Sequence, residues 1–185
     1  MPESPTTQLS EEHKLVLLVV EAMEREVAAI ERDDRVHADR VAEMVDFTRN
    51  FTDGCHHAKE EKILFPLLEE RDGPSRGTVS VLLSEHEGGR MAMRAIDDAL
   101  PHVDTDAAAR KTVAKSLADY AYVLRLHINK EDTLLFPRAD EVLVGDDRRR
   151  LTAEFARVEE EETRSGAHER YHKLAHDLAA FDPEA

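Results

Sequence analysis

Two short stretches of the chain, residues 56–66 and 127–137, contain the same residues that could bind a metal ion. In each stretch a histidine is followed by a glutamate four residues later and by Phe-Pro nine and ten residues later. A separation of four residues places two side chains on one helix face, about one turn apart, so an imidazole nitrogen and a carboxylate can reach the same ion. The repeat predicts two chelating pairs, which are His56 with Glu60 and His127 with Glu131.

The shared Phe-Pro spacing also discriminates between neighbouring candidates. It favours His56 over the adjacent His57, and the glutamate at position 60 over the one at position 61. In the second stretch Asp132 competes with Glu131, and the same alignment favours Glu131.

A single histidine precedes each pair by about the length of one helix and loop. His13 lies 43 residues before His56, and His86 lies 41 residues before His127. The histidines interrupt stripes that are otherwise apolar at helical spacing, so we expect them to face the interior of a helical bundle. The stripe residues are Leu17, Val20 and Val27 around His13, Val79, Leu82, Leu83 and Met93 around His86, and Val113, Leu117, Tyr120, Leu124 and Leu134 around His127.

Ionised carboxylates inside a protein core are destabilising by several kcal/mol each unless a positive charge compensates them. Two metal cations would supply that charge. Cys55 is the only cysteine, and nitrogen and oxygen ligands without thiolate suit iron, manganese or zinc. A carboxylate from each of two helices can bridge a pair of ions. The predicted metal ligands are His13, His56, Glu60, His86, His127 and Glu131, which leave coordination positions open for a small molecule.

The elements that position these residues are predicted to be helices, because Gly and Pro are sparse and no strand-like alternation appears. We expect helices over residues 10–30, 36–71, 78–100, from 104 or 105 to 144, and 148–181, with Ser10 as the first N-cap and a break at Ser165-Gly166. The predicted fold is all-α, an up-and-down four-helix bundle over about residues 10–144 with an additional C-terminal helix over about 148–181. The length of 185 residues suits one domain over residues 1–185.

The composition and charge argue against some classes of function. Forty acidic against 25 basic residues give a formal charge of −15, without a basic patch, which argues against nucleic-acid binding. The longest purely apolar run, residues 15–20, is too short to span a bilayer, and no secretory leader is visible, so we expect a cytoplasmic protein without a membrane partner. A monomer is the favoured state.

The ordered set of histidines and glutamates, with Phe-Pro closing each pair, resembles the hemerythrin-like (HHE cation-binding) proteins over most of the chain. The resemblance implies a non-haem di-iron centre, oxo- or hydroxo-bridged, inside a four-helix bundle. His13 and His56 would then serve one iron, and His86 and His127 the other. Both glutamates would be shared, and manganese or zinc is less favoured than iron.

The sequence departs from the oxygen-carrying hemerythrins at two places. Those proteins have a second histidine one turn after the third-helix ligand, where this chain has Arg90. They also bridge with an aspartate at the position of Asp132, which competes here with the preferred Glu131. The missing histidine argues against reversible oxygen transport. His168, His172 and His176, beside Tyr171, are candidates to fill the vacancy, although histidines at such spacing usually face water.

Three further residues have two readings each. Tyr120 is expected either to pack in the core or to donate a hydrogen bond near the metal. Gly88 and Gly89, inside a predicted helix, either permit close helix packing, which we favour, or leave room for a ligand.

The sequence therefore predicts a di-iron protein that binds or turns over O2, H2O2 or NO, with peroxide or nitric oxide chemistry favoured. The alternative is a module that senses or stores iron or oxygen without turnover. A structural zinc or manganese pair is a third hypothesis.

Overall fold

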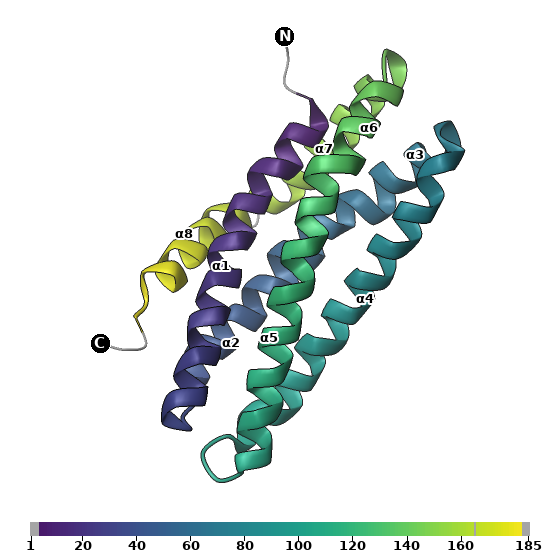
Figure 1. Ribbon diagram of the computed structural model, residues 1–185. Coiled ribbons are helices and arrows are strands. Elements are labelled where there is room, and N and C mark those ends of the chain that lie inside the picture. Colours follow the sequence, from purple (N-terminus) through teal and green to yellow (C-terminus); the bar gives the residue numbers. More distant parts are fainter. Residues whose placement is uncertain (1–3, 165, 183–185) are drawn as a thin grey trace.

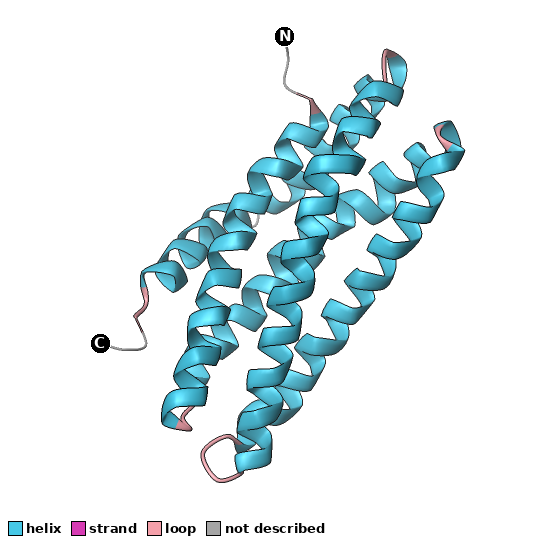
Figure 2. Ribbon diagram, in the orientation of Figure 1, coloured by secondary structure: helices cyan, strands magenta, loops and turns pink. Residues whose placement is uncertain are grey.

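The computed structural model describes residues 4–164 and 166–182, and these residues are almost entirely helical, with no strand among them (Figures 1 and 2). The predicted all-helical class is confirmed. The α-helices are α1 (Pro5–Asp33), α2 (Ala38–Phe47), α3 (Phe65–Arg71), α4 (Arg76–Ala99), α5 (Ala107–Lys130), α6 (Phe136–Val142), α7 (Asp146–Arg164) and α8 (Ala167–Ala180). Wider π-helical segments cover Thr48–His57, Glu60–Leu64 and Glu131–Leu135, and short 3-10 turns cover Gly73–Ser75 and Leu100–His102.

Consecutive long stretches of helix run in alternating directions. Figure 1 shows α1 descending, α2 to α3 ascending, α4 descending and α5 to α6 ascending. Helix α5 packs against both α1 and α4, and α8 packs against α1 and α2. Four stretches of chain therefore surround a common interior, and all four predicted ligand-bearing segments face it.

The first helix begins earlier than predicted. It starts at Pro5 after Ser4 rather than at Ser10, because proline has a φ angle suited to the first helical position and lacks only an N–H that would be unpaired there. Ser10 instead donates a side-chain hydrogen bond of 2.7 Å to Asp132. The helix ends at Asp33, where Asp34 adopts a left-handed conformation with φ 49°.

The Phe-Pro repeats coincide with repeated π turns. The backbone N–H of Phe65 donates to the carbonyl of Glu60, and that of Phe136 donates to the carbonyl of Glu131. A proline inside an α-helix clashes with the carbonyl four residues earlier, whereas a π turn contains an extra residue and is wider there. The helical path therefore continues past each proline.

The extra residue also shifts the helix register, which the predicted apolar stripe did not allow for. Leu135 is buried, and Leu134, predicted to face inward, is 61% exposed. The prediction that Leu83 faces inward is also wrong, because the adjacent Leu82 occupies the buried face of α4 and Leu83 is 37% exposed.

The predicted fifth segment is divided into two helices at the predicted break. Helix α7 ends at Arg164 and α8 begins at Ala167, with Gly166 between them at φ 70°. Ser165, the other half of the predicted break, lies outside the described residues. Tyr171, Ala175 and Leu178 of α8 are buried against the bundle, and the one-domain organisation remains a prediction.

Two apolar clusters fill the interior. One contains Val16, Phe51, Met93 and Leu124 among others, and the second contains Leu9, Leu64, Leu82 and Leu135 among others. On every one of the four stretches the predicted ligands lie in sequence between members of the two clusters. The polar centre is therefore enclosed by apolar layers on both sides. Among the described residues, no helix is both long and apolar enough to cross a membrane.

Candidate metal centre

All six predicted ligands lie in the interior, and the exposed fraction of each is 2% or less. They arrive from four different stretches of helix: α1, the two π-helical segments before α3, α4, and α5 with the π segment after it. With one further histidine, their ligand atoms form two groups, and the atoms within each group lie within 4.8 Å of one another. The groups are His13, His56, Glu60 and Glu131, and His57, Glu60, His86 and His127.

Glu60 belongs to both groups, and Glu131, a member of the first, also contacts a histidine of the second. Glu60 places Oε1 at 3.5 Å from Nε2 of His56 and Oε2 at 3.5 Å from Nε2 of His86. Glu131 places Oε2 at 3.3 Å from Nε2 of His13 and 3.2 Å from Nε2 of His127. Each carboxylate thus contacts one histidine of either group, Glu60 through both of its oxygens and Glu131 through Oε2 alone, so both lie where two ions could share them.

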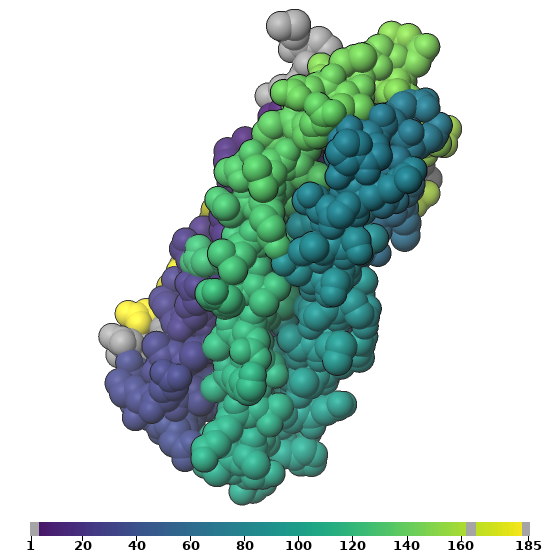
Figure 3. Space-filling model, turned by 45° about the vertical axis from the view of Figure 1, so that its right-hand side comes forward, coloured from purple at the N-terminus to yellow at the C-terminus, as the bar shows by residue number. Residues whose placement is uncertain are grey.

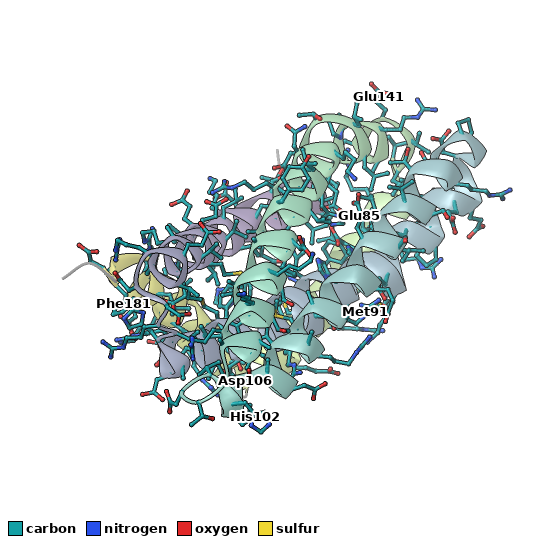
Figure 4. The ribbon with its side chains drawn as sticks, turned by 60° about the horizontal axis from the view of Figure 1, so that its bottom comes forward. Glu85, Met91, His102, Asp106, Glu141 and Phe181 are labelled. Carbon is teal, nitrogen blue, oxygen red and sulfur yellow. The ribbon has the colours of Figure 1, made fainter. Side chains whose placement is uncertain are left out.

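A second carboxylate holds the outer nitrogen of each predicted ligand histidine. The Nδ1 atoms lie 3.0 Å from Asp132 for His13, 2.9 Å from Glu12 for His56, 2.7 Å from Glu61 for His86 and 2.9 Å from Glu85 for His127. An imidazole that donates its Nδ1–H outward leaves the lone pair of Nε2 directed at the centre, as in metal-bound histidines. Figure 4 shows Glu85 on the side of α4 that faces α5.

These outer contacts follow the sequence repeat. The glutamate directly before each single histidine contacts the histidine of the following chelating pair and accepts a hydrogen bond from the lysine of that stretch. Glu12 thus accepts from Lys59, and Glu85 accepts from Lys130. The repeat therefore specifies the supports of the centre as well as its inner residues.

The phenylalanines of the Phe-Pro motifs support the single histidines. Phe136 stacks on His13 with ring centroids 5.5 Å apart, and Phe65 stacks on His86 at 6.0 Å.

Asp132 is 35% exposed at its side chain and contacts the outer nitrogen of His13. It lies outside both groups, and Glu131 is the inward carboxylate.

The charges of the centre are strongly coupled. Burial and the neighbouring Glu131 raise the pKa of Glu60 well above its usual range. Burial opposes ionisation of Glu131 too, but contacts with His127 and His13 outweigh it and lower the pKa of Glu131. Burial likewise opposes the charged form of His127, while Glu131 and Glu85 raise its pKa to about 9. Burial lowers the pKa of His56 to about 4.

Several buried polar atoms at the centre have no hydrogen-bond partner within the described part of the chain. They are both carboxylate oxygens of Glu60 and of Glu131, and the Nε2 atoms of His13 and His57. Unpaired buried polar groups are destabilising, so such atoms in a native core require an explanation. All of them are strong ligands for a hard or borderline cation, and this donor set fits a pair of metal ions.

A cavity of about 510 Å³ leads to the second group from the side of α4 and α5. Figure 3 shows these two helices next to each other on one face of the molecule. The cavity is lined by Gly88, Gly89 and Tyr120 as well as by His86 and His127. A side chain added at Gly88 would meet no atom within 4 Å, whereas one added at Gly89 would lie 3.0 Å from the ring of Tyr120. One glycine leaves room beside the centre and the other permits close packing.

The sequence interpretation missed His57 and considered one histidine cluster that lies elsewhere. His57 is buried with an exposed fraction of 5%, and the choice of a single register for the repeat excluded it. His168, His172 and His176 are exposed on α8, where they line a surface hollow with Glu11 and Lys14. Tyr171 packs against Phe47 and Phe51. Tyr120 is buried, and burial raises its pKa.

Comparison with known proteins gives matches at the level of family and relatives. The family model of the hemerythrin HHE cation-binding domain matches residues 4–139. The uncharacterized protein Rv1995 of Mycobacterium tuberculosis is 27% identical over 165 residues, which are 89% of this chain and 63% of that protein. The iron-sulfur cluster repair protein YtfE of Escherichia coli is 30% identical over 115 residues, which are 57% of this chain and 52% of YtfE. The chain thus spans between half and two thirds of these relatives, and no solved structure matches.

Proposed function

This chain belongs to the hemerythrin HHE cation-binding domain family, and we propose that it is a non-haem di-iron protein that binds or turns over peroxide, nitric oxide or dioxygen. The observation that carries the proposal is the pair of buried carboxylates, Glu60 and Glu131, each in contact with one histidine of either group. The similarity to YtfE, a protein named for iron-sulfur cluster repair, favours iron over zinc or manganese.

In this proposal His13 and His56 would hold one iron, His86 and His127 would hold the other, and Glu60 and Glu131 would be shared between them. The centre would lie inside a four-helix bundle, against which α7 and α8 pack as additional helices. The iron pair, when bound, supplies the electrons and the open coordination positions for reaction with a small molecule. The protein keeps the histidine nitrogens directed inward through their outer carboxylates and excludes bulk water through the two apolar clusters.

The cavity between α4 and α5 supports entry of a small exogenous ligand. Its volume of about 510 Å³ exceeds what a diatomic molecule or peroxide needs, and its lining reaches His86 and His127. Arg90 lies where the oxygen-carrying hemerythrins have a further histidine, and its guanidinium contacts Asp53, Glu61 and Glu87. A guanidinium paired with three carboxylates thus lies beside the centre at a position where an oxygen carrier has a metal ligand, and this difference in surroundings favours peroxide or nitric oxide chemistry over transport.

The deciding experiment is metal analysis of the purified protein combined with its near-ultraviolet and visible spectrum before and after addition of azide. We expect two irons per chain and charge-transfer bands that respond to azide. Iron-loaded protein is then mixed with hydrogen peroxide or nitric oxide, and consumption is followed with an electrode. A colourless protein that retains zinc would contradict the proposal, and coloured protein without turnover would limit it to binding.

The cavity offers a matched test of the entry route. Gly88→Leu places a side chain in the cavity, whereas Gly77→Leu adds the same group on α4 at a site that is also free of neighbours within 4 Å. We expect slower azide binding only in the Gly88 variant.

A second candidate function is storage or delivery of iron without turnover, which the similarity to YtfE supports. This function predicts that the iron-loaded protein transfers iron to a metal-free iron-sulfur protein but does not consume peroxide or nitric oxide. Measuring both activities on one preparation separates the two candidates.

A further inference from the structure

The two halves of the centre are related by the sequence repeat, and their contacts repeat with it. Each half has a single histidine, a chelating pair, a phenylalanine stacked on a single histidine and a lysine bound to an outer glutamate. Positions of the first half can therefore be compared with their counterparts in the second. Any polar contact found in only one half marks a departure that the shared bundle does not require.

Three positions break this symmetry, and their side chains form one chain of contacts. Nη1 of Arg90 lies 2.7 Å from Oδ1 of Asp53, and the same oxygen lies 3.4 Å from Nδ1 of His57. At the corresponding positions of the other half the residues are apolar. The counterparts are Leu124 for Asp53, Ile128 for His57 and Leu17 for Arg90.

His57 has the same orientation as the four predicted ligand histidines. Its side chain is buried, its Nδ1 faces a carboxylate, and its buried Nε2 has no hydrogen-bond partner among the described residues. Its ligand atom lies within 4.8 Å of those of Glu60, His86 and His127. The imidazole stacks on His86 with ring centroids 3.7 Å apart and an interplanar angle of 14°. An apolar residue would fill this place at no desolvation penalty, as Ile128 does in the other half.

Adjacent histidines can serve different ions because successive side chains diverge by about 100° around a helix axis. His56 turns toward α1, where its ring lies 4.7 Å from that of His13. His57 turns toward α4 and α5, where it meets His86 and His127. Two ion positions side by side in the bundle thus make use of both residues.

Arg90 connects the supports of two histidines. Its Nη1 lies 3.0 Å from Oε1 of Glu61, and that oxygen lies 2.7 Å from Nδ1 of His86. Through Asp53 the same guanidinium reaches His57. A residue that cannot bind iron therefore holds the two carboxylates behind a stacked pair of imidazoles.

We propose that His57 is a third imidazole ligand of the second ion, and that Arg90 is its positioning residue through Asp53. The centre is then asymmetric, with His13 and His56 at one ion and three histidines at the other. In effect a histidine from the second stretch of helix replaces the one that oxygen-carrying hemerythrins have at the position of Arg90. This inference rests on the proposed di-iron function.

The test exchanges His57 for the residue of the opposite half, His57→Ile, and uses His102→Ala as a control. Both variants and the parent protein are loaded with iron-57 and studied by Mössbauer spectroscopy, and iron per chain is measured during titration with a coloured chelator. The parent should show two unequal iron environments. His57→Ile should lower the affinity for one iron by at least about 10-fold, because loss of an outer-shell partner already lowers affinity about 10- to 100-fold, and it should change the signal of that iron alone.

Two further variants keep the inference testable if His57→Ile does not fold, which circular dichroism would reveal. Asp53→Leu and Arg90→Leu leave His57 in place and remove its supports at partly exposed positions. Both should keep two irons and shift the signal of one of them. Unchanged affinity and spectra in all folded variants would overturn the role of His57. A parent protein without bound iron would instead contradict the proposed function.

Discussion

Removal of the buried Lys59 should destabilise the metal-free protein far more than removal of Lys130, although the two lysines occupy equivalent positions of the repeat. Lys59 is fully buried and donates to Glu12, which is itself buried. Lys130 donates to Glu85 in the same way, but their side chains are 28% and 21% exposed. Lys→Met removes the ammonium group with its charge and hydrogen bonds, and keeps an unbranched apolar side chain that is one atom shorter.

The magnitudes follow from burial. Removing one partner of a buried ion pair destabilises a protein by about 3–5 kcal/mol, because the remaining charge is left without compensation. Burial raises the pKa of Glu12, but the hydrogen bonds and charges of His56 and Lys59 bring it to about 2. Since His56 still contacts Glu12 in the variant, we expect about 3 kcal/mol for Lys59→Met. Exposed pairs contribute about 0–1 kcal/mol because water screens them, and the partly exposed pair of Lys130 and Glu85 lies nearer to that limit, so we expect about 1 kcal/mol for Lys130→Met.

The assay is urea denaturation of metal-free protein, followed by circular dichroism. With a slope of about 2 kcal/mol per molar urea, the midpoint should fall by about 1.5 M for Lys59→Met and by about 0.5 M for Lys130→Met. The double variant with Glu12→Gln should be less destabilised than the sum of the single variants, because the unpaired carboxylate is gone. Equal shifts for the two lysines would refute the reasoning from burial.

The remaining predictions concern metal binding. His56→Ala should lower the iron content, whereas His102→Ala should not, and elemental analysis of both variants decides this. Saturating iron should raise the unfolding free energy, by about 2.7 kcal/mol at a free concentration of 100 times Kd. Calorimetry measures the unfolding temperature with and without a chelator, and a temperature that does not fall when iron is removed would contradict this prediction. Iron affinity should increase from about pH 6 to about pH 8, because the raised pKa values of Glu60 and His127 mean that protons must leave when iron binds. Isothermal titration at three pH values measures it, and a pH-independent affinity would contradict the assigned protonation.

Much of the centre could be predicted from the sequence because it depends on local helix geometry. Spacing of four residues on a helix determines that His56 and Glu60 share a face, and the same holds for His127 and Glu131. The Phe-Pro repeat selected Glu131 over Asp132, and the structure has Glu131 inward and Asp132 at the outer nitrogen of His13. The all-helical class follows from composition and from sparse Gly and Pro in the same way.

Other features were predicted wrongly although their causes are local, because the helical periodicity took no account of how proline changes the helix around it. The π turns before Pro66 and Pro137 change the register of the helix, so Leu134 faces water against the helical periodicity. The start of α1 moved to Pro5, because the preference of proline for the first turn outweighed Ser10 as a cap.

The sequence by itself determined which residue types could bind metal and which helix faces carry them, since a helix repeats its geometry every turn. Only the tertiary structure decided that Glu60 and Glu131 each reach histidines of both groups, because that depends on how four stretches of helix pack. It also decided that His57 lies beside His86 and that Arg90 supports both through Asp53 and Glu61. Adjacent residues diverge around a helix, and whether the second of two histidines meets water or a further ligand group depends on the neighbouring helices.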